Sequence, residues 1–295
     1  MADIATPGKT IEILQKYNFR FRKSLGQNFL IDPGVIDKII KASSITGEDL
    51  VIEIGPGIGS LTQALGRKAG AVLAVELDQN LIPILEENLA ELQNICIIQG
   101  DILKTDLSAL ILERKSQNPG LLNVRVVANL PYYITTPIMM DLLEKRLGLK
   151  SITVMIQREV ADRMTAAPGT KEYGALSLAV QYYAAPEIAG NVPPNCFLPR
   201  PQVGSAIVRL DLFEAPPVKT RDEKLMFQLI RGAFNQRRKT LLNALSNSSD
   251  LSFSKNSIIH AIMKVGLEEK IRGEALSLSQ FASLTDALLS GKSAI

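Results

Sequence analysis

Five short apolar runs alternate with helix-like segments over the first 157 residues of the chain. Each run has the length of a strand buried on both faces, and strands that alternate with helices form a parallel sheet covered on both sides. We therefore expect an α/β fold. The runs are LVIEIG (50–55), AVLAVEL (71–77), NICIIQGD (94–101), VRVVANL (124–130) and SITVMIQ (151–157).

The pattern changes after Arg158. YGALSLAVQYYAA (173–185) and SAIVRLDLF (205–213) are each expected to be a long strand, and the Pro-rich stretch 191–204 between them contains no clear crossover helix. Consecutive strands without such a crossover pair antiparallel. We place this pair at the edge of the sheet.

From about Pro216 the periodicity is wholly helical. A chain of 295 residues suits two domains, and EAPPVKT (214–220) is typical of a linker. We therefore expect one domain over residues 1–213 and a small all-helical domain over residues 214–295. The predicted helices are EKLMFQLIRGAF (223–234), RKTLLNAL (238–245), KNSIIHAIMKVG (255–266) and SLSQFASLTDALL (277–289).

Composition excludes several classes of protein. With 46% hydrophobic and 21% charged residues, the chain is neither disordered nor fibrous. No apolar run approaches the roughly 18 to 20 residues that cross a bilayer, and MADIATPGKT lacks the apolar core of a signal peptide. We expect a cytoplasmic protein without a membrane partner. No heptad pattern or long exposed edge argues for a partner chain, so a monomer is expected.

Positive charge is concentrated at the two ends of the chain. Lys and Arg outnumber Asp and Glu by five to two in residues 1–28 and by twelve to seven in residues 219–295, whereas residues 29–218 hold sixteen against twenty-one. Basic residues that meet phosphates release counterions and gain affinity, so this distribution favours a polyanionic partner. Ordinary solvated surface charge explains the counts equally well.

Cysteine and histidine offer little chemistry. Cys96 and Cys196 both lie in apolar surroundings, which favours small core residues over a disulfide. His260, on a predicted helix, fits a packed or surface imidazole. One His and two Cys make a protein metal site improbable, and no metal is expected.

A glycine-rich turn, EIGPGIGSLT (53–62), follows the first strand and precedes a helix. Gly55, Gly57 and Gly59 allow a tight turn and let backbone N–H groups approach a ligand, which favours a nucleotide. The dinucleotide pattern G-x-G-x-x-G would place a glycine where this chain has Ser60. Taken alone, the motif is equally explained by a close strand–helix turn.

The next two strands strengthen the nucleotide interpretation. AVLAVELD ends with Glu76, at the position where a carboxylate accepts both ribose hydroxyls of an adenosine, and IIQGDIL places Asp101 where it suits an adenine amine. Ligands of open parallel sheets bind outside the carboxyl ends of the strands. Three consecutive strands are thus predicted to present polar groups to one crevice.

Several motifs of the chain resemble a known family. GPGIG, VELD, GDIL and NLPYY are similar to the motif series of S-adenosylmethionine-dependent methyltransferases that modify the amino nitrogen of adenine. RKSLGQNFLIDP (22–33) resembles the N-terminal signature of the ribosomal RNA adenine dimethyltransferases. GTKEYGALSLAVQYY, FLPRPQVGSAIVRL and AFNQRRKTLLNAL extend the match. The resemblance is specific over roughly residues 22–246 and weaker beyond.

The resemblance implies a Rossmann-like class I methyltransferase with a mostly parallel sheet, an antiparallel edge strand and a helical C-terminal domain. It implies an enzyme that uses S-adenosylmethionine to dimethylate the N6 amines of two adjacent adenosines near the 3′ end of small-subunit (16S) ribosomal RNA. The substrate would be an immature 30S particle during ribosome biogenesis.

The family also implies the cofactor contacts. Asn28 and Leu30, in QNFL, would bring an N-terminal lid over the methionine moiety, although Leu30 also fits a hydrophobic staple before an Asp32 N-cap. The full set of expected cofactor-binding residues is Asn28, Leu30, Gly55, Gly57, Glu76, Asp101 and Asn129.

In such a family, the stretch NLPYY would act on the adenine. The Asn129 side-chain oxygen and the Leu130 carbonyl would accept hydrogen bonds from the N6 amine, and Pro131 would fix the turn and withhold a competing N–H. Tyr132 would stack on the extruded base, with Phe197 as the family's second stacking face. Tyr133 is expected to pack behind the site.

The RNA surface is expected to be basic and scattered, because structured RNA is recognised mostly through shape and backbone. Arg20, Arg22 and Lys23 flank the proposed lid, and a second basic cluster lies at the start of a helix in the small domain. For both clusters, ordinary solvated surface charge is the alternative explanation. The predicted RNA-binding residues are Arg22, Lys23, Arg237, Arg238 and Lys239.

Three other hypotheses remain at this point. A related family methylates a large-subunit (23S) adenosine and confers macrolide resistance, and it shares elements like NLPY and FLPRP; the helical tail after Pro216 favours the small-subunit enzyme. A non-catalytic RNA-binding assembly factor would not need the intact Asn129 and Tyr132. A nicotinamide oxidoreductase is disfavoured, because no acid–base His or Lys–Tyr pair accompanies the glycine turn.

Overall fold

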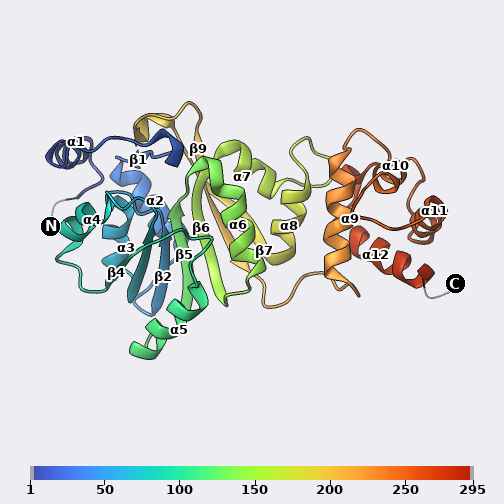
Figure 1. Ribbon diagram of the computed structural model, residues 1–295, viewed down its shortest axis with the longest axis horizontal. Helices are drawn as coiled ribbons and strands as arrows, with labels where there is room; N and C mark the ends of the chain where they lie inside the picture. The colour runs from blue at the N-terminus through green and yellow to red at the C-terminus, as the bar shows by residue number, and fades with distance from the viewer. Residues whose placement is uncertain (1–2, 293–295) are drawn as a thin grey trace. The chain divides into compact units, whose positions relative to one another are not determined.

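The structure, a computed structural model, describes residues 3–292 apart from the side chains of Lys23 and Lys292. Its internal contacts divide the chain into two compact units (Figure 1). The sheet unit comprises the chain up to Ala161 together with Pro186–Leu212, and the helical unit comprises Asp162–Ala185 together with the chain from Phe213 onward.

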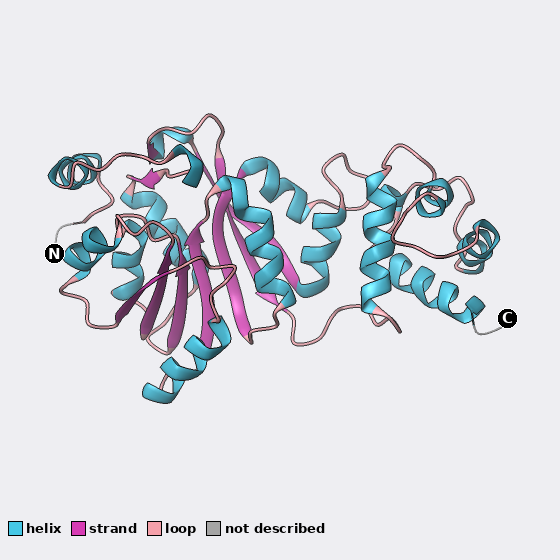
Figure 2. Ribbon diagram, viewed as in Figure 1, coloured by secondary structure: helices cyan, strands magenta, loops and turns pink. Residues whose placement is uncertain are grey.

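A seven-stranded sheet forms the centre of the sheet unit, and Figure 2 shows its strands in magenta. The strand order is β4-β3-β2-β5-β6-β9-β7. The neighbours from β4 through β6 pair parallel, and β9 pairs antiparallel with β6. All five predicted core strands are present, which confirms the α/β class. The strands are β2 (Asp49–Ile54), β3 (Ala71–Glu76), β4 (Ile95–Gln99), β5 (Asn123–Asn129), β6 (Leu149–Gln157), β7 (Ala184–Val192) and β9 (Ser205–Leu212).

Helices cover the sheet because the crossovers between parallel strands must bury their apolar sides against it. Ile39 of α2 and Leu65 of α3 pack in one fully buried cluster with Val51 of β2 and Val127 of β5. The crossover between β4 and β5, residues 100–122, is long because it contains the helix α5. Besides α1 and the start of α7, which are described below, the α-helices of this unit are α2 (Pro33–Ser43), α3 (Ser60–Gly66), α4 (Ile82–Leu89), α5 (Leu107–Gln117) and α6 (Thr135–Glu144).

The N-terminal segment is anchored to the sheet unit at both of its ends. Helix α1 (Pro7–Lys16) packs its buried Ile13 and Leu14 against α4, and Lys16 and Tyr17 both bind the Glu87 carboxylate. Further along, the short strand β1 (Phe29–Leu30) pairs antiparallel with β8 (Phe197–Leu198). Asp32 then caps α2 by accepting hydrogen bonds from two backbone N–H groups, as the sequence predicted.

The prediction of a strand over residues 173–185 is wrong, because most of this segment forms the helix α8 (Ala175–Tyr183). Ala, Leu and Gln are good helix formers, and the Gly174 N–H donates to the Ser177 hydroxyl where the helix begins. The strand that pairs antiparallel is β9, which lies one place inside the edge strand β7.

The helical unit has its own hydrophobic core, in which Leu229, Leu241, Ile262 and Phe281 are fully buried. The segment 162–185 belongs to it: the Tyr173 hydroxyl donates to the Leu276 carbonyl at 2.8 Å. The predicted division after residue 213 therefore differs from the observed units in this segment. The remaining helices are α7 (Arg158–Thr165), which spans the division, and α9 (Glu223–Asn235), α10 (Leu241–Ser246), α11 (Lys255–Lys264) and α12 (Leu278–Lys292).

Among residues 3–292, no helix is long and apolar enough to cross a membrane.

A buried ion pair joins three strands of the sheet. Arg125 Nε donates to Asp49 Oδ2 at 3.0 Å, Arg125 Nη1 donates to the Ser151 hydroxyl at 2.7 Å, and Asn123 Nδ2 donates to Asp49 Oδ1 at 2.9 Å. The Asp49 side chain is fully buried and the Arg125 side chain is 6% exposed. Each charge therefore depends on the other for compensation.

We expect Arg125→Ala to lower the free energy of unfolding by about 3–5 kcal/mol, because it leaves the buried Asp49 charge without its partner. Urea denaturation measures the change. Lys9→Ala, which breaks the exposed Lys9–Glu12 pair, is the control and should cost less than about 1 kcal/mol. Equal costs for the two variants would contradict this account.

Candidate active site

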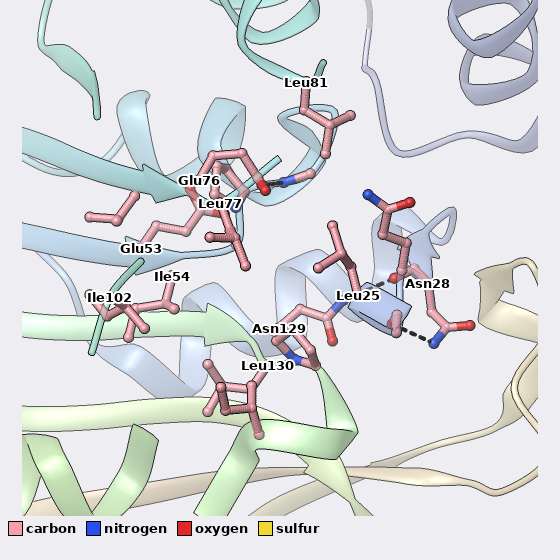
Figure 3. Close-up of a pocket in the computed structure, with 18 of the residues that line it drawn as sticks. Leu25, Asn28, Glu53, Ile54, Glu76, Leu77, Leu81, Ile102, Asn129 and Leu130 are labelled. Atoms are coloured by element: carbon pink, nitrogen blue, oxygen red, sulfur yellow. Dashed lines mark hydrogen bonds between the residues drawn. The ribbon is translucent and has the colours of Figure 1, made fainter. Parts of the chain in front are cut away.

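A cavity opens at the carboxyl ends of β2, β3 and β5, where ligands of open parallel sheets bind. Its empty volume is about 1070 Å³, including the part that is open to solvent. Residues 25–30 of the N-terminal segment form one wall (Figure 3). Strand ends that are distant in sequence therefore share one cavity, as the sequence predicted.

The glycine turn after β2 contains three residues with positive φ angles, a backbone conformation that favours glycine. Gly55, Gly57 and Gly59 have φ angles of 69°, 63° and 94°, which side chains rarely tolerate. A Cβ at Gly57 would also lie 3.0 Å from the Phe29 ring. The turn thus brings bare backbone to the cavity wall, with the Gly57 N–H directed at Glu76.

Glu76, at the end of β3, is 6% exposed and lines the cavity. Its carboxylate accepts from the Gly57 N–H at 3.2 Å and from the Asp78 N–H at 2.8 Å, and Figure 3 shows the first of these bonds. Burial raises the pKa of Glu76, and the backbone donors oppose that shift. The two backbone donors fix the orientation of the carboxylate.

Asp101, just beyond β4, also lines the cavity and is half-buried. Its Oδ1 accepts from the Leu103 N–H at 3.0 Å, an Asx-type turn that sets the side-chain direction. Lys104 Nζ lies 3.9 Å from Oδ2, but its side chain is 84% exposed, so this ion pair is weak. The carboxylate remains available for a ligand amine.

Asn129 is the last residue of β5, and its side chain connects this strand to the N-terminal wall of the cavity. Its Nδ2 donates to the Asn28 carbonyl at 3.2 Å, and Asn28 Nδ2 in turn donates to the Gly26 carbonyl at 3.0 Å (Figure 3). With the amide nitrogen occupied in this way, the side-chain oxygen of Asn129 is the acceptor that a ligand would use. Leu130 is held by its N–H, which donates to the Met155 carbonyl at 3.1 Å.

Two tyrosines follow at the cavity rim. The Tyr132 hydroxyl hydrogen-bonds the Ser205 hydroxyl at 2.6 Å, which fixes the ring, and burial raises the pKa of Tyr132. Pro131 lies in an extended conformation before them and lines the cavity with both rings. Tyr133 is 54% exposed, so the expectation that it packs behind the site is wrong.

Phe197 does not form a face of the cavity. Its ring is 3% exposed and packs in one core cluster with Leu30 and with Ile36 of α2, and it pairs with Leu30 between β1 and β8. This placement corrects the expected stacking role. Phe197 instead holds the strand that carries Leu30, which does line the cavity.

The predicted RNA-binding residues differ in how free their side chains are. Arg22 pairs with Asp78, with Nη1 and Oδ1 separated by 3.3 Å, and Arg237 pairs with Glu274 at 2.7 Å. In the helical unit, two further basic side chains, Arg238 and Lys239, are exposed. The side chain of Lys23 lies outside the described part of the chain.

Sequence analysis missed the polar groups that underlie the glycine turn. Glu53 is 1% exposed and lines the cavity. Among the described residues, its Oε2 has no hydrogen-bond partner, and neither do the buried hydroxyls of Ser60 and Thr62. Burial raises the pKa of Glu53 to about 8, and the nearby Glu76 charge adds to this shift. The signal was available: a Glu inside a strand buried on both faces.

Replacing Glu53 should change how stability depends on pH. Because folding raises its pKa from 4.5 to about 8, the folded protein keeps a proton that the unfolded chain releases. The contribution of protonated Glu53 to the free energy of unfolding is therefore fully present below pH 4.5. It is lost as the pH rises from 4.5 to about 8. We expect Glu53→Gln to become progressively more stable than the wild type from about pH 5 to about pH 8, in urea denaturation.

The control for this prediction is Glu48→Gln, at an exposed position just before the same strand. Its stability should run parallel to that of the wild type across the pH range. A Glu53→Gln variant whose stability also runs parallel would contradict the assignment of a protonated carboxyl.

The strand order, with antiparallel β9 inserted between β6 and β7, and a cavity at the parallel strand ends define a Rossmann-like protein of the class I methyltransferase type. A family model described as ribosomal RNA adenine dimethylase matches residues 18–286. The chain belongs to this family, as the sequence motifs predicted.

Curated relatives agree with the family model over nearly the full chain. A protein of Lachnoclostridium phytofermentans is 56% identical over 98% of both chains, and one of Alkaliphilus oremlandii is 51% identical over 98% of this chain and 99% of its own. Both are named ribosomal RNA small subunit methyltransferase A. These names favour the small-subunit interpretation over the large-subunit alternative.

Solved structures share the architecture. A dimethyladenosine transferase from Plasmodium falciparum superposes with a TM-score of 0.72 at 27% identity, covering 90% of this chain and 98% of its own. The 23S rRNA methyltransferase ErmE gives 0.66 at 24% identity, covering 88% and 99%, a likeness of fold alone. The comparisons confirm the fold class.

Proposed function

We propose that this chain transfers methyl groups from S-adenosylmethionine to the N6 amines of two adjacent adenosines near the 3′ end of small-subunit (16S) ribosomal RNA. One observation carries the proposal: the acceptor amide of Asn129 and the carboxylates of Glu76 and Asp101 line the same cavity. A nucleoside donor and an adenine acceptor therefore have polar partners at adjoining positions.

The residues of the cavity fit an adenosyl cofactor. Gly57 lacks the Cβ that would fill the turn, Glu76 presents a fixed carboxylate for ribose hydroxyls, and Asp101 presents an acceptor for the adenine amine. Asn28 and Leu30 line the wall on the side of Asn129, where the methionine moiety would lie. When bound, the cofactor supplies a methyl group attached to a positively charged sulfur, which leaves as a neutral thioether.

The acceptor amine needs help, because its lone pair is delocalised into the adenine ring. The Asn129 oxygen and the Leu130 carbonyl would accept its two hydrogens and turn the lone pair toward the methyl carbon. With the cofactor bound, the nitrogen–carbon bond would form as the carbon–sulfur bond breaks, and the nitrogen would release its proton to solvent. Much of the rate would come from holding sulfur, carbon and nitrogen in line.

Tyr132 is the stacking face in this arrangement. Its ring is held by the Ser205 hydroxyl, so an extruded base meets a preorganised surface. Exposed Tyr133 lines the same rim and offers a second aromatic face in place of Phe197. Stacking of this kind contributes about 1 to 3 kcal/mol per base.

The substrate form and the setting are part of the proposal. The curated relatives carry small-subunit names, and we propose an immature 30S particle in the cytoplasm as the substrate and a monomer as the active form. Exposed Arg238 and Lys239 in the helical unit, and Arg20 in the sheet unit, are the basic residues we assign to RNA phosphates.

Substituting Asn129 tests the catalytic role. We expect Asn129→Ala to lower kcat by about 10²–10³-fold, the usual cost of removing one such polar group, while the RNA is still bound. Tyr132→Ala should cost about 10- to 100-fold, and Tyr132→Phe, which keeps the ring, much less. Full methyl transfer by Asn129→Ala would contradict the catalytic role of Asn129, whereas no methyl transfer by the wild type, with its assembly role unchanged in Asn129→Ala, would indicate a non-catalytic factor.

The substrate is tested with labelled S-adenosylmethionine and particles from cells that lack the modification. We expect label in N6,N6-dimethyladenosine of 16S RNA from immature 30S particles, and none in 23S RNA from 50S particles. Label confined to 23S RNA, with macrolide survival of cells that carry the gene, would overturn the small-subunit proposal.

A further inference from the structure

A polar cluster ties the N-terminal wall of the cavity to the end of β3. Gln27 Nε2 donates to Asp78 Oδ2 at 2.9 Å, and Arg22 Nη1 lies 3.3 Å from Asp78 Oδ1. Gln27 Oε1 accepts from the Arg22 backbone N–H at 2.8 Å. Arg22, Gln27 and Asp78, which we call the Asp78 cluster, therefore connect two segments that are distant in the sequence.

The burial of Asp78 makes this connection strong. Its side chain is fully buried, whereas the Arg22 side chain is 48% exposed. A buried carboxylate must have hydrogen-bond and charge partners. Within its own turn Asp78 accepts from the Asn80 N–H at 3.1 Å, and its remaining partners in this cluster come from the N-terminal segment.

The same residue also fixes the ribose-binding carboxylate. The Asp78 N–H donates to Glu76 Oε1 at 2.8 Å, while the Gly57 N–H holds the other oxygen. Arg22 and Asp78 are not among the residues that line the cavity, whereas Gln27 and Glu76 are. Asp78 thus connects the N-terminal wall to Glu76 without reaching the cavity.

We propose that Arg22 and Asp78 are positioning residues for the cofactor: through Gln27 and Glu76 they hold the N-terminal wall against the carboxylate that accepts the ribose. The inference rests on the proposed function of this cavity. It replaces the RNA-contacting role predicted for Arg22 from the sequence, because its guanidinium already serves a buried carboxylate.

The first experiment measures binding of S-adenosylhomocysteine by calorimetry, without RNA, to the full chain. We expect Arg22→Ala and Asp78→Asn each to raise Kd about tenfold, and the double variant to bind about as weakly as Asp78→Asn alone, because both changes break one connection. Lys68→Ala, which alters an exposed basic residue of the same unit, is the control and should leave Kd unchanged.

A second pair of variants separates positioning from general destabilisation. Gln27→Glu places two carboxylates against each other, and we expect Kd to rise at least tenfold. Adding Asp78→Asn lets the new amide donate to the new carboxylate, with donor and acceptor exchanged. This double variant should recover most of the affinity, which a merely damaged fold would not do. Persistent weak binding in the double variant would count against the inference.

Three outcomes are distinguishable. If Arg22→Ala binds S-adenosylhomocysteine like the wild type but shows a higher KM for RNA, Arg22 is an RNA contact and the inference is overturned. If kcat falls with Kd unchanged, the inference is also overturned. If the wild type itself does not bind the nucleoside, the proposed function fails, and the inference fails with it.

Discussion

The parallel pairing of β2 with β3 and with β5 determines where the polar residues of the cavity lie. Parallel register places the carboxyl ends of neighbouring strands at one edge of the sheet, so each turn beyond a strand delivers its polar residue to the same cavity. Gly57, Glu76 and Asn129 come together for this reason alone. The antiparallel strand β9 contributes from the other direction, since Ser205 at its start holds Tyr132.

The N-terminal segment completes what the strand ends begin. It is fixed by the packing of α1 on α4, by the β1–β8 pairing and by polar bonds to Asp78 and Asn129. It is thus a built wall of the cavity with several attachments. The positions of Asn28 and Leu30 in the cavity wall therefore depend on residues that do not line the cavity.

Sequence patterns were sufficient for the features that follow from short-range rules. Strand length and apolar periodicity predicted β2 to β6, strand ends predicted the cavity with Glu76 and Asp101, and the family resemblance implied Asn129. Tertiary packing decided the rest. Residues 173–185 have apolar spacing that suits either a strand or a helix. Phe197 carries no local signal that distinguishes a core ring from a stacking face. The Arg22–Asp78 pair depends on chain segments that meet only after folding.

We propose that one cavity at the parallel strand ends binds the adenosyl donor beside the adenine acceptor. A crystal structure of the chain with S-adenosylhomocysteine would show where the nucleoside lies. We expect the ribose hydroxyls within hydrogen-bond distance of the Glu76 carboxylate, the adenine amine at Asp101 and the sulfur facing Asn129. A nucleoside bound elsewhere, or with its sulfur turned away from Asn129, would contradict the account.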